Sequence, residues 1–148
     1  MKIGKLACLT AGLISVASLT PSARADDIKL AVQPELNWET TPEGVAFASL
    51  KGNRFDESYM AMVRLPAGLI SPVHTKSAGM YGLIVSGEMV HLSENEIGGS
   101  EVVLKAGDYY EIPAHLPHLS KCVSEVECVT FLYQDGPFDF VPVGEGRK

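Results

Sequence analysis

The amino-acid sequence predicts an all-β protein built around one small antiparallel barrel. Three observations support this prediction. After an N-terminal leader, the chain is long enough for one domain only, its β-prone runs are short, and glycine, proline or asparagine separates them. No long stretch places apolar residues at helical spacing, so we expect little helix.

The first 25 residues have the pattern of a secretory signal peptide. Two lysines precede an uncharged apolar run over residues 6–19, and small residues follow it up to Ala25. We expect cleavage between Ala25 and Asp26, and therefore a periplasmic or secreted protein. The apolar run of 14 residues is shorter than the ~20 residues of a membrane-spanning helix. A lipid anchor at Cys8 is not expected, because this cysteine lies at the start of the run and not after it.

Removal of this leader changes the size and the charge of the chain. It leaves 123 of the 148 residues, enough for one domain with a core and too few for two. The leader holds three of the 12 basic residues and none of the 18 acidic ones, so the net charge changes from −6 to −9. An acidic surface argues against nucleic acid and anionic lipid as partners. No other apolar stretch is long enough to cross a membrane.

The predicted barrel domain spans residues 44–148. Its expected strands, each rich in β-branched, aromatic or other apolar residues, are 45–50, 59–65, 69–74, 80–86, 89–92, 101–104, 109–112, 118–123 and 127–133. The polar segment 26–43, which contains two prolines, is expected to be an arm that lies along the barrel or crosses to a partner subunit. Because such an arm covers a sheet edge that would otherwise invite aggregation, we also expect a homodimer.

Two segments resemble the two motifs of the cupin family. Residues 68–87 resemble the first motif, a glycine, five residues, His-x-His, an acid and a further glycine, with His74 as the first histidine. Residues 107–118 resemble the second, in which a proline and a later histidine follow the glycine. With the ending 135–140, the chain is similar more narrowly to small, largely uncharacterised bacterial single-domain cupins related to the cupin domain of the anti-sigma factor ChrR. The resemblance covers nearly the whole chain after the leader and implies an RmlC-like jelly-roll barrel.

The resemblance also implies a divalent metal ion inside the barrel, and with it an oxidoreductase activity such as that of a dioxygenase. His74 and His118 match the first and last histidine positions and are expected to converge inside the barrel. Lys76 stands at the second histidine position and Met80 at the position of the acid. An ammonium group has no lone pair and repels a cation, and a thioether is a poor ligand for hard ions. We therefore expect only a weak metal site, formed by His74 and His118.

Only two other histidines can complete such a site. His115 lies in the loop before His118 and can swing toward the pocket. His91 is expected on a strand that returns from the turn at Gly87, opposite roughly residue 84. At ~3.3 Å per residue, this places it about 13 Å along the barrel from the level of Met80. On this reasoning His91 is a poor replacement ligand.

A pocket without a metal is the alternative. Lys76 pointing inward beside His74 would suit a carboxylate, a phosphate or a sugar acid. Burial and a nearby imidazolium would lower the pKa of Lys76 and make it the candidate catalytic base of an isomerase or lyase. Two further alternatives stay open: Lys76 extends to water at the rim of the barrel, or the barrel is a non-catalytic ligand-sensing domain with a degenerate metal site. Under each of these hypotheses, the expected partner is a small molecule.

Two cysteines, Cys122 and Cys128, remain after the leader is removed. An oxidising compartment favours a disulfide between them. Polar residues between two β-prone runs predict a hairpin with the cysteines opposed across its base. Cys122 as a thiolate metal ligand is disfavoured, because four strand residues separate it from His118 by about 13 Å. The closed loop is short, so we expect a stabilisation of about 2 kcal/mol.

Overall fold

The computed structural model describes residues 27–144. The predicted signal peptide, residues 1–25, lies outside the described residues. The chain divides into a short unit, Met1–Leu30, and a large unit, Ala31–Lys148, and the fold described below is that of the large unit. Within residues 27–144 no helix is long and apolar enough to span a bilayer.

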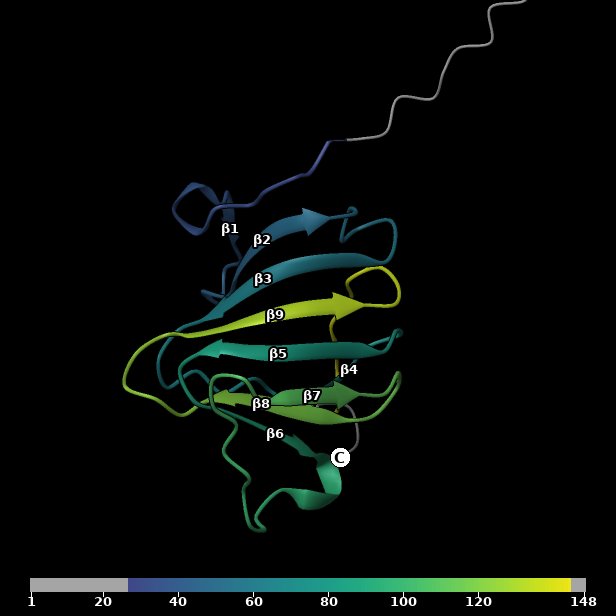
Figure 1. Cartoon of the computed structure of the whole chain (residues 1–148). Coiled ribbons are helices and arrows are strands. Elements are labelled where there is room, and N and C mark those ends of the chain that lie inside the picture. Colours follow the sequence, from purple (N-terminus) through teal and green to yellow (C-terminus); the bar gives the residue numbers. More distant parts are fainter. Residues whose placement is uncertain (1–26, 145–148) are drawn as a thin grey trace, which may run out of the picture. The chain divides into compact units, whose positions relative to one another are not determined.

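Two antiparallel sheets form the large unit (Figure 1). One sheet has six strands in the order β1-β2-β3-β9-β5-β7, and the other has four in the order β10-β4-β8-β6. The strands are β1 (Trp38–Thr40), β2 (Ala46–Lys51), β3 (Tyr59–Leu65), β4 (His74–Thr75), β5 (Met80–Ser86), β6 (Met89–Ser93), β7 (Tyr109–Ile112), β8 (His118–Cys122), β9 (Cys128–Gln134) and β10 (Val141–Pro142). Two short 3₁₀ turns, η1 (Gln33–Glu35) and η2 (Glu94–Glu96), are the helical elements of the described residues. The all-β prediction is confirmed.

From β3 onward the chain alternates between the two sheets. Among β3 to β10, the odd-numbered strands lie in the six-stranded sheet and the even-numbered strands in the four-stranded sheet. Along β3 and β9 every second residue is buried, as expected for strands with one face toward a core. The main apolar core draws on both sheets, for example on Val63 of β3 and Met89 of β6. Strands that are consecutive in the sequence from β3 to β10 therefore face each other across the core and are not paired side by side.

Three predicted strands have the observed bounds: residues 59–65, 80–86 and 109–112. Two predictions are wrong. Residues 69–73 are not a strand and pair only through a bridge between Ile70 and Lys121, in a segment where Pro72 has no N–H to donate. Residues 101–104 likewise pair only through Leu104, with Met89.

The predicted arm contains β1, which pairs with β2 of the same chain. Trp38 lies opposite Ala48, and the Arg64 guanidinium lies 3.9 Å from the centre of the Trp38 ring. This strand covers the edge of β2 that would otherwise carry unpaired backbone groups. Homodimer formation stays a prediction.

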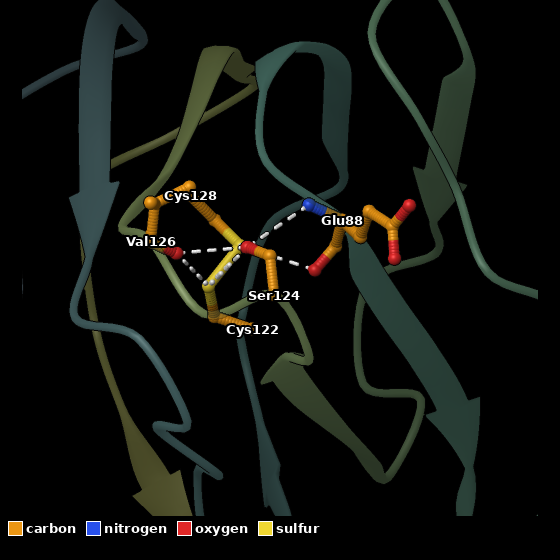
Figure 2. The surroundings of a disulfide bond; sticks show 5 residues. All are labelled: Glu88, Cys122, Ser124, Val126 and Cys128. Atoms are coloured by element: carbon orange, nitrogen blue, oxygen red, sulfur yellow. Dashed lines mark hydrogen bonds between the residues drawn. A yellow bond between two sulfur atoms is a disulfide. The ribbon is translucent and has the colours of Figure 1, made fainter.

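A disulfide joins Cys122 and Cys128, with the two Cα atoms 5.7 Å apart (Figure 2). The predicted hairpin is wrong, because β8 and β9 belong to different sheets. The bond therefore crosslinks the two sheets at the point where the chain passes from one to the other. Ser124, in the connecting loop, donates a hydrogen bond to the Val126 carbonyl and accepts one from the Glu88 N–H.

Gly87 packs directly against this disulfide. Its φ of +80° favours glycine, and a Cβ atom there would lie 2.9 Å from both Cα and Sγ of Cys128. The first motif ends in a glycine because the turn from β5 to β6 passes this close to the crosslink.

Candidate functional site

His74 of β4 and His118 of β8 lie side by side on the four-stranded sheet. They are directly opposite each other in the register, and their ring centres are 4.3 Å apart. Each Nδ1 lies within hydrogen-bond distance of a backbone carbonyl two residues earlier, Pro72 O at 2.9 Å and Leu116 O at 2.8 Å. Because a carbonyl only accepts, each Nδ1 carries the proton and each Nε2 keeps a lone pair.

His91 belongs to the same group, contrary to the sequence-based expectation. Its strand, β6, pairs with β8 and not with β5, and the register places His91 opposite Ser120 and His118 opposite Ser93. His91 and His118 are therefore diagonal neighbours on adjacent strands, for which the usual Cα–Cα distance is roughly 7–8 Å. The expectation failed because it took β6 as the hairpin partner of β5, whereas the chain changes sheets at Gly87.

All three imidazoles are uncharged at neutral pH. Burial lowers the pKa of His74 to about 4 and that of His91 to about 4, and burial also lowers the pKa of His118. The imidazolium that was expected to act on Lys76 is therefore not present at pH 7. Nε2 of His91 and of His118 is buried and has no hydrogen-bond partner in the described part of the chain. Buried polar atoms without partners are uncommon in folded proteins.

Lys76 is buried and does not extend to water at the rim. Only 7% of the residue is exposed. Its Nζ donates a hydrogen bond of 2.6 Å to the Asp139 carbonyl and lies 4.1 Å from the centre of the Phe138 ring. Burial lowers the pKa of Lys76 to about 8, against an opposing effect of the Asp139 carboxylate. At neutral pH the group is mainly a cation that readily becomes an amine.

The carboxylate of Asp139 is held by a different partner. Both of its oxygens lie 3.0 Å from the backbone N of Ser77, which donates to them. Among residues 27–144 no carboxylate forms an ion pair with Lys76. Within the described residues, the direct contacts of the ammonium are thus a carbonyl and aromatic rings, and the Asp139 carboxylate acts on it without an ion pair.

A cavity of about 770 Å³ lies between the sheets, and Lys76 is part of its wall. His74, Met80 and His91 line it as well. Much of the remaining wall is aromatic or aliphatic and includes Phe47, Tyr59, Tyr110, Leu132, Phe138 and Phe140. The cavity is of the size and character that proteins use for small organic ligands.

Two predicted pocket residues do not line this cavity. His118 is buried beside His74, and Phe140 stacks on the His74 ring with the ring centres 4.0 Å apart. His115 is exposed in the loop before β8, where its φ of 63° places it in the left-handed region. Only its backbone approaches the site, because its N–H donates to the Lys76 carbonyl at 2.8 Å.

The residues at the four motif positions do not fit a divalent metal ion. His74 and His118 offer lone pairs, but Lys76 and Met80 offer an ammonium and a thioether. No group of three or more His, Cys, Asp or Glu side chains in residues 27–144 is arranged to hold a metal. Cys122 is not a thiolate ligand, because its sulfur is in the disulfide.

Sequence reasoning missed four residues of the site. Phe138 and Phe140 come from the segment between β9 and β10, and Arg54 lies 4.7 Å from the Phe47 ring and lines the cavity. His91 is the fourth. The ending 135–140 stood out in the sequence only as part of a resemblance. The available signal was the spacing of Phe138 and Phe140, since residues at i and i+2 of an extended segment point to the same side.

Comparisons with known proteins agree on the fold. A family model of the cupin domain matches residues 61–132. No curated protein sequence matches the chain significantly. The narrower similarity to the ChrR-related group stays a prediction.

Several solved structures resemble the chain. An RmlC-like cupin from Shewanella frigidimarina NCIMB 400 is 19% identical with a TM-score of 0.57, over 74% of this chain and 92% of that chain. The polyketide cyclase RemF from Streptomyces resistomycificus is 15% identical with a TM-score of 0.64, over 82% and 89%. The DMSP lyase DddQ from Ruegeria pomeroyi DSS-3 is 22% identical with a TM-score of 0.59, over 76% and 64%. At these identities the likeness is one of fold, an RmlC-like jelly-roll barrel.

Proposed function

This chain is a small cupin-domain protein, and from that premise we propose that its cavity binds a small carboxylate with an apolar or aromatic body, without a metal ion. The observation that carries the proposal is the buried ammonium of Lys76 on the wall of an aromatic cavity. A buried charge without an ion-paired opposite charge is unfavourable. A bound carboxylate would supply that charge and form a charge-assisted hydrogen bond.

The cavity wall favours one class among the expected anions. A sugar acid or a phosphate would bring several polar oxygens against a wall that is largely aromatic, at Phe47, Phe138 and Phe140, and desolvating these oxygens is unfavourable. An aromatic or aliphatic body fits this wall, and only its carboxylate needs a polar partner. We therefore favour apolar carboxylates over sugar acids and phosphates.

The neutral histidines give the ligand a second point of recognition. Nε2 of His91 is buried without a hydrogen-bond partner among residues 27–144, and His91 lines the same cavity as Lys76. A hydroxyl group on the ligand would satisfy this atom in either tautomer of His91, because a hydroxyl can donate or accept. Such a contact would fix the orientation of the ligand, as a few polar groups do in mainly apolar pockets.

We further propose that the protein acts outside the cytoplasm. The support is the leader pattern of residues 1–25, together with a cysteine pair that persists in an oxidising compartment. The intact mass of the exported protein tests this: we expect a chain that begins at Asp26. An exported species that retains residues 1–25 would contradict it.

Titration calorimetry with benzoate tests the binding proposal. We expect saturable binding to the wild-type protein and a loss of about 10- to 100-fold in affinity for Lys76→Met, the range for a hydrogen bond to a charged group. Lys105→Met is the matched control, since Lys105 is an exposed lysine paired with Glu88. It should bind benzoate as the wild type does.

Two outcomes would contradict the proposal. One is equal benzoate affinity in Lys76→Met and the wild type. The other is a stoichiometric metal in protein purified without chelator, whose removal abolishes binding. The second outcome would favour the metal-holding alternative on His74 and His118.

A further inference from the structure

We propose that Nζ of Lys76 forms an imine with an aldehyde or ketone bound in the cavity. The inference rests on the proposed function, because it uses the same cavity and the same lysine. It names a second ligand class, carbonyl compounds with an apolar body, and a covalent step.

Lys76 differs from other lysines of the described chain in its surroundings. Lys105 and Lys121 are ion-paired with Glu88 and Glu101, respectively. Lys76 is buried, has no carboxylate partner among residues 27–144, and lies on a cavity wall. Lysines that act as nucleophiles toward carbonyl groups are found desolvated in apolar pockets of this kind.

The segment between β9 and β10 holds the lysine in place. One N–H of Lys76 is taken up by the Asp139 carbonyl, and the Phe138 ring lies 4.1 Å from Nζ. Phe140 lies further away, with its ring centre 5.8 Å from Nζ. These contacts limit the directions that the nitrogen can face. They also keep water from much of its surroundings, which favours an imine over its hydrolysis.

The step is balanced without a further reactant. The neutral amine adds to the carbonyl carbon, a C–N bond forms, and the carbonyl oxygen takes up a proton to give a carbinolamine. The C–O bond then breaks, the oxygen leaves as water, and the nitrogen loses its second proton. Amine and carbonyl compound thus give imine and water, and nothing is oxidised or reduced. The uncharged imidazoles of His74 and His91 line the same cavity and can accept the protons that the nitrogen releases.

Reductive trapping with benzaldehyde and sodium cyanoborohydride tests the inference on the wild-type protein. The reductant converts an imine to a stable benzyl amine, and peptide mapping by mass spectrometry locates it. We expect Lys76 to be labelled at least 10-fold faster than Lys105 or Lys121. Added benzoate should protect Lys76, because both compounds occupy one site.

Variants provide the matched comparison. Lys76→Met should lose the fast-labelled peptide, while Lys105→Met should keep it, and circular dichroism checks that both are folded. Benzoate binding without preferential labelling of Lys76 would overturn the imine and leave the proposed function standing. Fast labelling of Lys76 without any benzoate binding or protection would support the imine and overturn the carboxylate proposal.

Discussion

The two ends of the barrel are built differently, although β8 and β9 run between them. The disulfide end, defined by Gly87, Cys122 and Cys128, is closed by a covalent bond between the sheets and by a glycine packed against it. The histidine end, defined by His74, Lys76 and His118, is closed by the segment between β9 and β10 through hydrogen bonds and aromatic contacts.

This difference indicates that the disulfide end contributes stability and the histidine end binds the proposed ligand. At the disulfide end, the crosslink and the close contacts leave no room for a larger side chain. Such dense packing stabilises the fold. At the histidine end, among residues 27–144, buried polar atoms lack hydrogen-bond partners and Lys76 forms no ion pair. Groups left unsatisfied in this way are unfavourable for folding and are common where a ligand binds. Changes at the two ends should therefore affect different properties.

Restoring the motif should have the largest effect, because it changes which ligand the histidine end can hold. The double variant Lys76→His, Met80→Glu places two further imidazole or carboxylate donors beside His74 and His118. We expect elemental analysis to find about one divalent ion per chain in this variant, a number typical of a site with four protein ligands. The control is Lys76→Met, Met80→Leu, which alters the same positions without adding donors. A wild-type protein that already holds one ion per chain would contradict the comparison.

Acidification should weaken the histidine end. Burial lowers the pKa of His74 and His91 to about 4, from 6.5 in the unfolded chain. Between these values the unfolded chain binds protons that the folded chain does not, so the free energy of unfolding falls as the pH drops from about 6.5 to about 4. Each histidine contributes a slope of up to about 1.4 kcal/mol per pH unit.

Denaturant titrations at pH 7 and pH 5 measure this slope. The variant His91→Gln should show a shallower slope than the wild type. His115→Asn is the matched control at an exposed histidine, with asparagine chosen because it tolerates a positive φ. A slope that is equal in His91→Gln and the wild type would show that His91 is not held neutral.

Loss of the disulfide should reduce stability and leave binding intact. The variant Cys122→Ser, Cys128→Ser is expected to lose about 2 kcal/mol of unfolding free energy, since the closed loop is short. Denaturant titration measures the loss, and its benzoate affinity should equal that of the wild type. Thiol titration of the denatured wild-type protein should find both cysteines unreactive. A large loss of benzoate affinity would show that the two ends are coupled.

The smallest expected effect is the difference between Gly87→Ala and a matched control, which isolates the packing against the disulfide. The cost of Gly87→Ala combines the positive φ of +80° with a Cβ placed 2.9 Å from Cys128 atoms. Gly107→Ala is the matched control, with a φ of +95° and nothing within 4 Å of the added Cβ. The control should lose about 1–2 kcal/mol from its backbone conformation alone. Gly87→Ala should lose more in the same denaturant titration, and an equal loss would mean that the turn yields without cost.

Strand positions followed from the sequence because their causes are local. Alternation of apolar and polar side chains and the turn residues between them gave the bounds of residues 59–65, 80–86 and 109–112. The same reasoning failed for residues 69–73 and 101–104, whose pairing depends on which distant strand is within reach. Periodicity reports that a segment can be a strand and does not report its partner.

The features of the candidate site likewise divide into those that the sequence determines and those that the fold determines. The spacing of His74, Lys76 and Met80, and the chemistry that makes them a poor metal set, are properties of the sequence alone. That His91 joins the site, that the disulfide crosslinks two sheets, and that Phe138 covers Lys76 depend on the alternation of the chain between sheets. The physical reason is the distance along the sequence over which each cause acts. Side-chain chemistry and strand periodicity involve only a few neighbouring residues. Burial, and with it the charge state of Lys76 and His91, is decided by distant segments that the fold brings around them.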